Sequence, residues 1–307
     1  MKRMTALDSR PPDTGASGIA FLVPAYLIWG LSPLYWKLVD HVNSFELLLH
    51  RTIWSLAFLV LIIFLQKRGR ELANIMKSPA LMASLAGTTL ILALNWYLFI
   101  WAINHEHILQ ASLAYYMNPL ITVLLGMVFF SERLSRMQLA ALVTAGAGVV
   151  YYTVFLGEFP WISVTIAVTF AVYSLLHKLM PVLPLPGLLI ETLILSVPSA
   201  GWLILLGSKG GGAMLHNGAQ TDLLLVGTCL VTGLPLLIFT IGTKRSSLTT
   251  VGFLQYIAPC CSFLLAVLYF REPFSSQKLV AFIMIWAALA IYSMDSIVAG
   301  KRQKYRS

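Results

Sequence analysis

A few ionisable side chains interrupt the long apolar stretches of this chain. Glu46 and His50 are four residues apart, so on a helix they share one face. Arg51 follows directly and points about 100° away from His50. Imidazole titrates near neutral pH, which suits a proton-transfer step beside a carboxylate. The pair predicts a ligand or proton site, and the alternative is a salt-bridged helix end that reaches the lipid headgroups.

Polar and aromatic residues within other apolar stretches extend this candidate site. Asn95, next to Trp96, must find a hydrogen-bond partner, which either a solute or a neighbouring helix would supply. Trp96 offers a ring face to an aromatic or cationic solute. We expect Asn95 and Trp96 to line a solute-binding cavity together with Glu46, His50 and a further set of residues. That further set is Trp29, Ser32, Tyr35, Tyr116, Asn118, Gln255 and Tyr256.

The composition shows which elements must position these residues. Of the 307 residues, 58% are apolar and 11% are charged, whereas about a quarter of a globular protein is charged. This excludes a soluble domain and a disordered chain. The three cysteines all lie in apolar runs, and two of them are neighbours, so no disulfide framework is indicated. The composition predicts an all-α, polytopic membrane protein.

A helix crosses the hydrocarbon core of a bilayer with about 20 apolar residues. With this length, the sequence predicts ten spans. They are residues 18–37, 45–66, 80–102, 109–130, 137–155, 160–177, 187–206, 222–242, 248–270 and 277–297.

The basic residues predict the orientation of these spans. With the N-terminus inside, most of the 21 Lys and Arg residues fall on the cytoplasmic side, as the positive-inside rule requires. We therefore expect both termini to be cytoplasmic. The formal net charge of +9 then reflects topology, and we expect no nucleic-acid partner.

An internal repeat divides the ten spans into two halves. Residues 109–152 align without gaps with residues 249–292, and the identities include Tyr116 with Tyr256 and Pro119 with Pro259. Five spans per half is an odd number, so the halves run through the membrane in opposite directions. Inverted repeats with a site between them near the midplane are typical of secondary transporters.

Three further glutamates, Glu191, Glu132 and Glu272, occupy positions that have an acidic counterpart in the other half. Glu191 is the counterpart of Glu46, and we favour its interpretation as an interfacial carboxylate on the cytoplasmic side over a buried site. Glu132 and Glu272 occupy equivalent loops after the fourth and ninth spans. We interpret Glu132 as a structural anchor of its loop.

Several motifs of the sequence resemble those of the RarD-type permeases, in the EamA family of the drug/metabolite transporter superfamily. They include Trp29-Gly30-Leu31-Ser32-Pro33, Leu94-Asn95-Trp96, Asn118-Pro119-Leu120 and Glu132-Arg133-Leu134. The resemblance implies ten helices in two inverted five-helix EamA repeats, with both termini in the cytoplasm. It also implies an inner (plasma) membrane location, and a central cavity surrounded by the first four helices of each half.

This resemblance and the repeat set the expected domains. Residues 1–17 form a cytoplasmic tail, 18–155 the first EamA repeat, 156–298 the second repeat, and 299–307 a basic cytoplasmic tail. The small residues Ala141, Ala145 and Gly148 allow close helix packing, either within the monomer or in a homodimer.

The sequence predicts a secondary-active transporter of a small organic metabolite or drug-like solute, working by alternating access between the repeats. No Walker motif is present, so an ion gradient, with protons as a candidate, or the solute itself must supply the energy. The alternatives are a passive channel or facilitator and a membrane-embedded metal-dependent enzyme that uses His105 and His107. We expect no enzymatic activity, no catalytic residue, no bound metal and no cofactor. The expected partners are the solute and the lipid bilayer.

Overall fold

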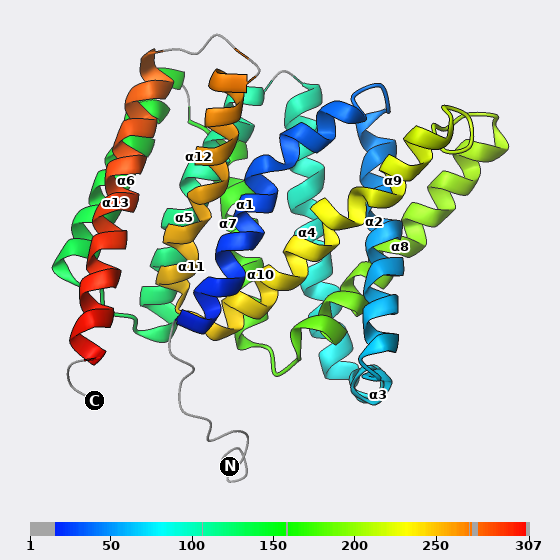
Figure 1. Ribbon diagram of the computed structural model, residues 1–307, viewed down its shortest axis with the longest axis horizontal. Coiled ribbons are helices and arrows are strands. Elements are labelled where there is room, and N and C mark those ends of the chain that lie inside the picture. Colours follow the sequence, from blue (N-terminus) through cyan, green and yellow to red (C-terminus); the bar gives the residue numbers. More distant parts are fainter. Residues whose placement is uncertain (1–15, 106, 158, 270, 272–275, 305–307) are drawn as a thin grey trace.

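The structure is a computed structural model that describes residues 16–304, apart from residues 106, 158, 270 and 272–275. The described part of the chain contains helices and no strand (Figure 1). The helices are α1 (Ala16–Leu38), α2 (Ser44–Leu65), α3 (Gly69–Met76), α4 (Pro79–Asn104), α5 (Ile108–Phe130), α6 (Arg136–Leu156), α7 (Trp161–Leu179), α8 (Pro184–Ser208), α9 (Ala219–Val231), α10 (Gly233–Arg245), α11 (Leu248–Gln255), α12 (Ile257–Leu264), the π-helical turn η1 (Leu265–Tyr269) and α13 (Ser276–Lys304).

These helices confirm the predicted all-α membrane fold. Within the described residues, nine segments are long and apolar enough to cross a bilayer, and α9 with α10 counts as one of them. The tenth predicted span is α13, which carries the apolar stretch Leu279–Asp295. Every predicted span lies within a few residues of an observed helix or helix pair. The sequence did not predict the short helix α3.

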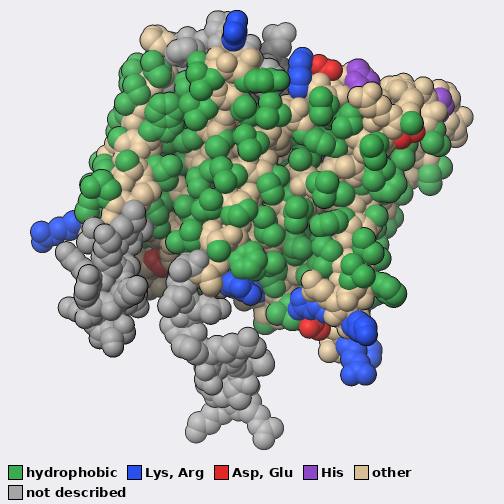
Figure 2. All heavy atoms as spheres, viewed as in Figure 1, with side chains coloured by type: hydrophobic (Ala, Val, Ile, Leu, Met, Phe, Trp, Pro, Cys, Tyr) green, Lys and Arg blue, Asp and Glu red, His purple; other side chains and the backbone are tan. Residues whose placement is uncertain are grey.

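The surface matches what a bilayer requires. Successive spans alternate in direction, so that the first residues of α1 and the last residues of α13 lie at the same edge of the bundle (Figure 1). Figure 2 shows one flank covered by hydrophobic side chains, with Lys and Arg gathered at the two ends. The apolar flank is suited to contact with the hydrocarbon core of a bilayer. The basic side chains at the two ends are suited to its aqueous interfaces.

Local sequence explains where the helices begin and where two of them break. Asn43 Oδ1 accepts hydrogen bonds from the backbone N–H groups of Phe45 and Glu46, and so caps the start of α2. The eighth span breaks at Thr232, three residues before Pro235. Proline has no backbone N–H group and so cannot form the hydrogen bond that would continue the helix. The ninth span breaks at Tyr256, three residues before Pro259, for the same reason.

The small residues of α6 pack inside the monomer. Ala141 and Ala145 are fully buried in a cluster with Ile285 of α13. A Cβ atom added to Gly148 would lie 3.2 Å from the Cβ atom of Met284. The stripe therefore lets α13 approach α6 closely, as expected for packing within the monomer.

The repeat-equivalent helices α5 and α11 touch each other across the two halves. A Cβ atom on Gly252 would lie 2.7 Å from the backbone oxygen of Pro119 and 2.6 Å from Val123 Cγ2. Only glycine fits at this distance. The contact joins the two halves of the chain.

Candidate functional site

A small cavity lined by both polar and apolar residues lies among helices from both halves of the chain. Its volume is about 20 Å³, enough for a group the size of a water molecule. It lies between α2 and α4 of the first half and α8 and α10 of the second, and several of its residues are near the middle of these spans. We call it the central cavity. Its walls are Arg51, Thr52, Ser55, Leu92, Trp96, Leu188, Glu191, Thr192, Leu195, Thr232, Gly233 and Leu236.

A larger, mostly apolar pocket adjoins the central cavity. It has a volume of about 310 Å³ and lies among α2, α4 and α8, reaching the end of α4 at Trp101 and His105. It shares the wall residues Thr52, Trp96 and Leu195 with the central cavity. We call it the outer pocket. Its walls are Phe45, Leu48, Leu49, Thr52, Ala93, Trp96, Tyr97, Ile100, Trp101, His105, Leu195 and Ser199.

Three polar groups on the wall of the central cavity have buried atoms without a hydrogen-bond partner. These atoms are Arg51 Nε, Ser55 Oγ and Thr232 Oγ1. The guanidinium carbon of Arg51 lies 4.3 Å from the centroid of the Trp96 ring, a cation–π contact. Among the described residues, no acidic side chain forms an ion pair with Arg51. A buried cation and two hydroxyl groups without partners are costly unless a ligand or water satisfies them.

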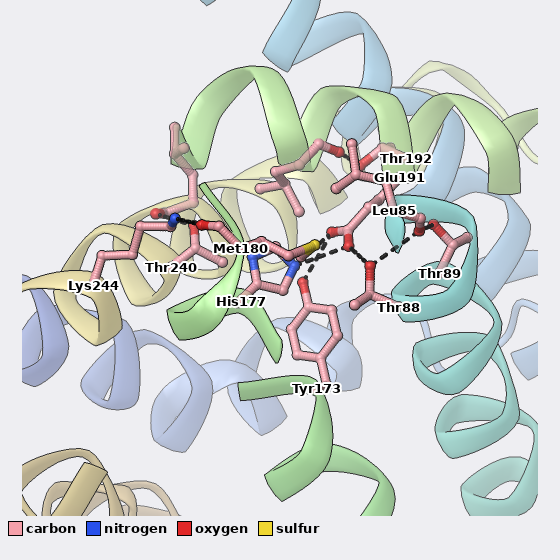
Figure 3. A network of polar contacts seen from close by, with 12 residues as sticks. Leu85, Thr88, Thr89, Tyr173, His177, Met180, Glu191, Thr192, Thr240 and Lys244 are labelled. Carbon is pink, nitrogen blue, oxygen red and sulfur yellow. Dashed lines mark hydrogen bonds and ion pairs between the residues drawn. The ribbon is translucent and has the colours of Figure 1, made fainter. Parts of the chain in front are cut away.

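Glu191 lies at another wall of the central cavity and binds three side chains (Figure 3). His177 Nε2 lies 2.9 Å and 3.0 Å from its two carboxylate oxygens. The Tyr173 hydroxyl donates to Oε2 at 3.2 Å, and the Thr88 hydroxyl donates to Oε1. His177 and Tyr173 come from α7 and Thr88 from α4, and all three point toward the carboxylate of Glu191, which belongs to α8.

This network differs from the interfacial position expected for Glu191. Only 1% of Glu191 and 2% of His177 are exposed. The difference arises because α4 packs against α8 and the side chains of Tyr173 and His177 reach across from α7, so that together they cover the carboxylate. A buried carboxylate is stable only with such donors around it. Glu191 is therefore part of the protein interior.

Glu46 and His50 form a second buried pair at the start of α2. They are 7% and 4% exposed, and His50 Nε2 lies 3.5 Å from Glu46 Oε1. The same oxygen accepts a hydrogen bond of 2.6 Å from the backbone N–H of Ala213, in the segment after α8. Each half of the chain thus carries one buried histidine–glutamate pair. The pairs lie toward opposite ends of the bundle, because α2 and α8 begin at opposite ends (Figure 1).

Of the residues predicted to line a cavity, Trp96 borders both of the cavities described above. Asn95 instead donates from Nδ2 to the backbone oxygen of Ile166 at 2.7 Å and to Thr169 Oγ1 at 2.9 Å. Asn95 therefore has a neighbouring helix as its hydrogen-bond partner, the alternative to a solute, and these bonds join α4 to α7. The other predicted residues lie at further helix contacts.

At the α1 contacts, Trp29 packs among Tyr26, Phe170 and Phe239. The Ser32 hydroxyl donates to the Trp29 backbone oxygen at 2.8 Å. The Tyr35 hydroxyl donates to the backbone oxygen of Leu224 in α9.

At the contact between α5 and the ninth span, the Tyr256 hydroxyl donates to the Tyr116 backbone oxygen at 3.1 Å. Thr122 Oγ1 lies 3.2 Å from Asn118 Oδ1 and 3.3 Å from Gln255 Oε1. These four predicted residues therefore join the two halves, and none of them borders the central cavity or the outer pocket.

One end of the bundle is closed by polar contacts between helix ends. Glu132 accepts hydrogen bonds of 2.8 Å from the backbone N–H groups of both Leu248 and Thr249, and one of 2.6 Å from the Thr249 hydroxyl. It therefore caps α11, in the other half of the chain, and acts as an anchor. Its repeat equivalent, Glu272, lies outside the described residues.

The ends of α7 and α10 are joined at the same end of the bundle. Lys178 Nζ donates to the backbone oxygens of Thr243, at 3.3 Å, and Ser246. Lys244 Nζ donates to the Met180 oxygen at 2.6 Å (Figure 3). Together with Glu132, these lysines form a set of contacts that we call the inner closure.

The histidines considered as metal ligands stack on an aromatic ring. The rings of His105 and His107 lie 4.6 Å and 5.6 Å from the ring of Trp101, at interplanar angles of 21° and 19°. Between them, Glu106 lies outside the described residues. The part of the chain that the structure describes contains no group of three or more His, Cys, Asp or Glu suited to a metal ion.

Sequence reasoning missed several residues of this site. Ser55, Thr88, Tyr173, His177 and Thr232 are polar or titratable groups within or at the end of apolar runs. That property was the available signal, but it is shared by many threonine and serine residues that only bond their own helix.

Comparisons with known proteins agree with this architecture. Residues 16–154 match the EamA-like transporter family. A transporter of Vibrio cholerae is 42% identical over 283 residues, which cover 92% of this chain and 94% of that protein. Protein RarD of Escherichia coli is 39% identical over 285 residues, covering 93% and 96%.

Two further comparisons concern another bacterial transporter and the fold. The transporter YojE of Bacillus subtilis is 36% identical over 284 residues, which cover 91% of this chain and 94% of that protein. A protein of known crystal structure superimposes with a TM-score of 0.70 at 21% identity, covering 91% of this chain and 98% of that one. This last similarity concerns the fold alone.

Proposed function

The chain belongs to the EamA family of transporters, as a RarD-type permease, and we propose that it is a secondary transporter of a small organic solute. The observation that carries the proposal is the central cavity. Six of its twelve wall residues are polar or charged, it lies near the middle of the spans, and both halves of the chain contribute to it. Midplane sites between inverted repeats are typical of secondary transporters. Because one chain supplies both halves of the site, we propose the monomer as the transport unit, in the inner membrane with both termini cytoplasmic.

We propose alternating access as the mechanism of this transport. The outer pocket adjoins the central cavity on one side, and the inner closure joins the ends of α5 to α11 and α7 to α10 on the other. Rocking of one half against the other would have to break the inner closure before solute leaves on that side. Its contacts are few and polar, so water can replace them when they separate.

We propose protons as the coupling ion, with the buried histidine–glutamate pairs as the proton sites. Glu191 faces His177 and Tyr173 from α7 and Thr88 from α4, and it lines the same cavity as Arg51 from α2. A carboxylate and an imidazole at hydrogen-bond distance can share and exchange a proton. Ionisable groups inside a membrane are costly and mark ion pathways in pumps and transporters. Glu46 and His50 lie 3.5 Å apart in the first half as a second, more widely spaced pair, in which His50 Nε2 has no hydrogen-bond partner.

Proteoliposomes loaded with a uniformly ¹³C-labelled bacterial metabolite extract test this proposal. We expect a subset of labelled solutes to exchange with unlabelled extract outside, only in vesicles that contain the protein. With an imposed pH gradient we expect the same solutes to accumulate against their own gradient. Release without saturable exchange would indicate a passive facilitator, and no protein-dependent movement of any solute would contradict the proposal.

A further inference from the structure

We propose that the transported solute carries a carboxylate, bound by Arg51, Ser55 and Thr232 in the central cavity, with an apolar body in the outer pocket. This inference rests on the proposed transport function and names the class of its solute. The two cavities adjoin at Thr52, Trp96 and Leu195, and the proposal places one molecule across both.

The charge of Arg51 indicates the sign of the ligand. A guanidinium has five N–H donors and no acceptor, and it remains protonated in proteins. Arg51 lies within an apolar span, its Nε is buried without a partner, and no acidic side chain pairs with it among the described residues. The Trp96 ring stabilises the cation but accepts none of its ordinary hydrogen bonds. A bound anion would satisfy both the charge and the donors.

The two hydroxyl groups of the cavity reinforce this assignment. Ser55 Oγ and Thr232 Oγ1 are buried without partners on the same wall as Arg51 Nε. A hydroxyl can donate to a carboxylate oxygen, so all three groups can serve one acceptor ligand. Gly233 packs directly against Ser55, since a Cβ atom there would lie 2.8 Å from Ser55 Oγ, so a side chain at this position would displace the Ser55 hydroxyl.

Glu191 does not compete for this role. Both of its oxygens already accept hydrogen bonds from the side chains of α4 and α7. Its proton exchange and the binding of an anion at Arg51 would affect each other, because both groups line one cavity of about 20 Å³.

Size and polarity define the rest of the solute. The central cavity has room for a group about the size of a water molecule, which suits a carboxylate oxygen better than a bulkier phosphate or sulfonate. The outer pocket of about 310 Å³ is lined mainly by aliphatic and aromatic residues, including Trp96, Tyr97 and Trp101. Such walls accept an apolar or aromatic body.

A matched set of indole compounds tests the inference on the purified full-length protein. Indole-3-acetate, indole-3-acetamide and tryptamine share one ring system and differ in the charge of the side group. We expect calorimetric titration to show that the acid binds at least about 10-fold more tightly than the amide and the amine, since hydrogen bonds to a charged partner are the stronger ones. Hexanoate and hexanamide repeat the comparison with an aliphatic body.

Variants locate the binding site. We expect Arg51→Gln to lower the affinity for the acid by at least about 10-fold and to leave the affinity for the amide unchanged. Ser55→Ala and Thr232→Val keep the side-chain size nearly constant, and each should weaken the acid severalfold. Arg136→Gln, at an exposed position of α6, removes the same charge and should leave binding unchanged.

The outcomes separate this inference from the transport proposal. Equal binding of acid and amide, undiminished acid binding by a folded Arg51→Gln variant, or no binding of either acid by the wild-type protein would overturn the carboxylate assignment. Exchange of labelled metabolites in proteoliposomes would still support transport in those cases. Loss of that exchange, with acid binding at Arg51 intact, would instead overturn the transport proposal.

Discussion

The Arg51 guanidinium carbon lies 4.3 Å from the centroid of the ring of Trp96, a residue that lines both the central cavity and the outer pocket. The contact joins α2 to α4 at a position where Arg51 has no acidic partner. The tryptophan ring therefore holds the cation in place and leaves its donors available. This relationship underlies both the proposed site and the proposed class of solute.

Substitution of Trp96 should lower the affinity for the solute, and a substitution that removes more of the aromatic ring should lower it more. We expect Trp96→Leu to lower the affinity for indole-3-acetate by about 10-fold, because both the cation–π contact and the aromatic wall disappear. Trp96→Phe keeps a smaller ring and should lower it less. Tyr151→Leu, at an exposed position of α6 that borders neither cavity, is the control. An unchanged affinity in a folded Trp96→Leu variant would contradict this role of the ring.

Removal of the cap across the two halves should destabilise the protein. Glu132→Ala removes three hydrogen bonds to α11, and loss of a helix N-cap costs about 0.5–2 kcal/mol. We expect a lower melting temperature in detergent micelles. Glu71→Ala is the matched control, because Glu71 pairs with Arg68 on the partly exposed helix α3, and such pairs contribute about 0–1 kcal/mol. Equal melting temperatures for the two variants would argue against the anchoring role of Glu132.

The contact of α11 with α5 should tolerate no side chain at Gly252. We expect Gly252→Ala to destabilise the protein by about 1–3 kcal/mol, because the added methyl group meets the Pro119 backbone oxygen. Gly146→Ala in α6 is the control, since nothing lies within 4 Å of its added Cβ atom. There, alanine should be neutral or stabilising, as expected from helix propensity. Thermal unfolding of both variants measures the difference, and a Gly252→Ala protein as stable as the control would show that the helices separate easily.

Alternating access predicts that a buried position of the inner closure becomes accessible during transport. Ser246 is 5% exposed, and its backbone oxygen accepts a hydrogen bond from Lys178. We expect Ser246→Cys, in a background with Cys229→Ala, Cys260→Ser and Cys261→Ala, to react with a membrane-impermeant thiol reagent faster when transported solute is present.

A cysteine in place of the exposed Lys77 provides the control for this labelling. It should react at the same rate with and without solute. If the Ser246→Cys protein shows no change in labelling rate during solute exchange, the inner closure does not open in the transport cycle.

The membrane spans could be predicted from the sequence because their signal is local. About 20 consecutive apolar residues satisfy the bilayer wherever they pack. Helix α3 was missed because it has only eight residues, GRELANIM, with four apolar positions, and follows the basic segment after α2. The breaks at Thr232 and Tyr256 follow from prolines that the sequence displays, although their exact positions depend on packing.

The site was harder to predict because it depends on which helix faces meet. Asn95 and Trp96 are neighbours in sequence, yet Asn95 bonds α7 while Trp96 lines both cavities. His177 lies at the end of its predicted span and gave no sign of a buried partner. It meets Glu191 only because its side chain reaches across from α7 to α8 at the level of this carboxylate. The sequence contains the polar residues, but the helix contacts decide which of them face a cavity.

The central claim is that Glu191 couples proton movement to transport, and gradient-driven accumulation by Glu191→Gln tests it most directly. Glutamine keeps the shape of the side chain but cannot bind and release the proton. For a solute that exchanges in the labelled-extract assay, we expect the variant to lose at least about 90% of the accumulation driven by a pH gradient while it retains exchange without a gradient. Glu71→Gln should behave as the wild type. Full gradient-driven accumulation by Glu191→Gln would contradict the account.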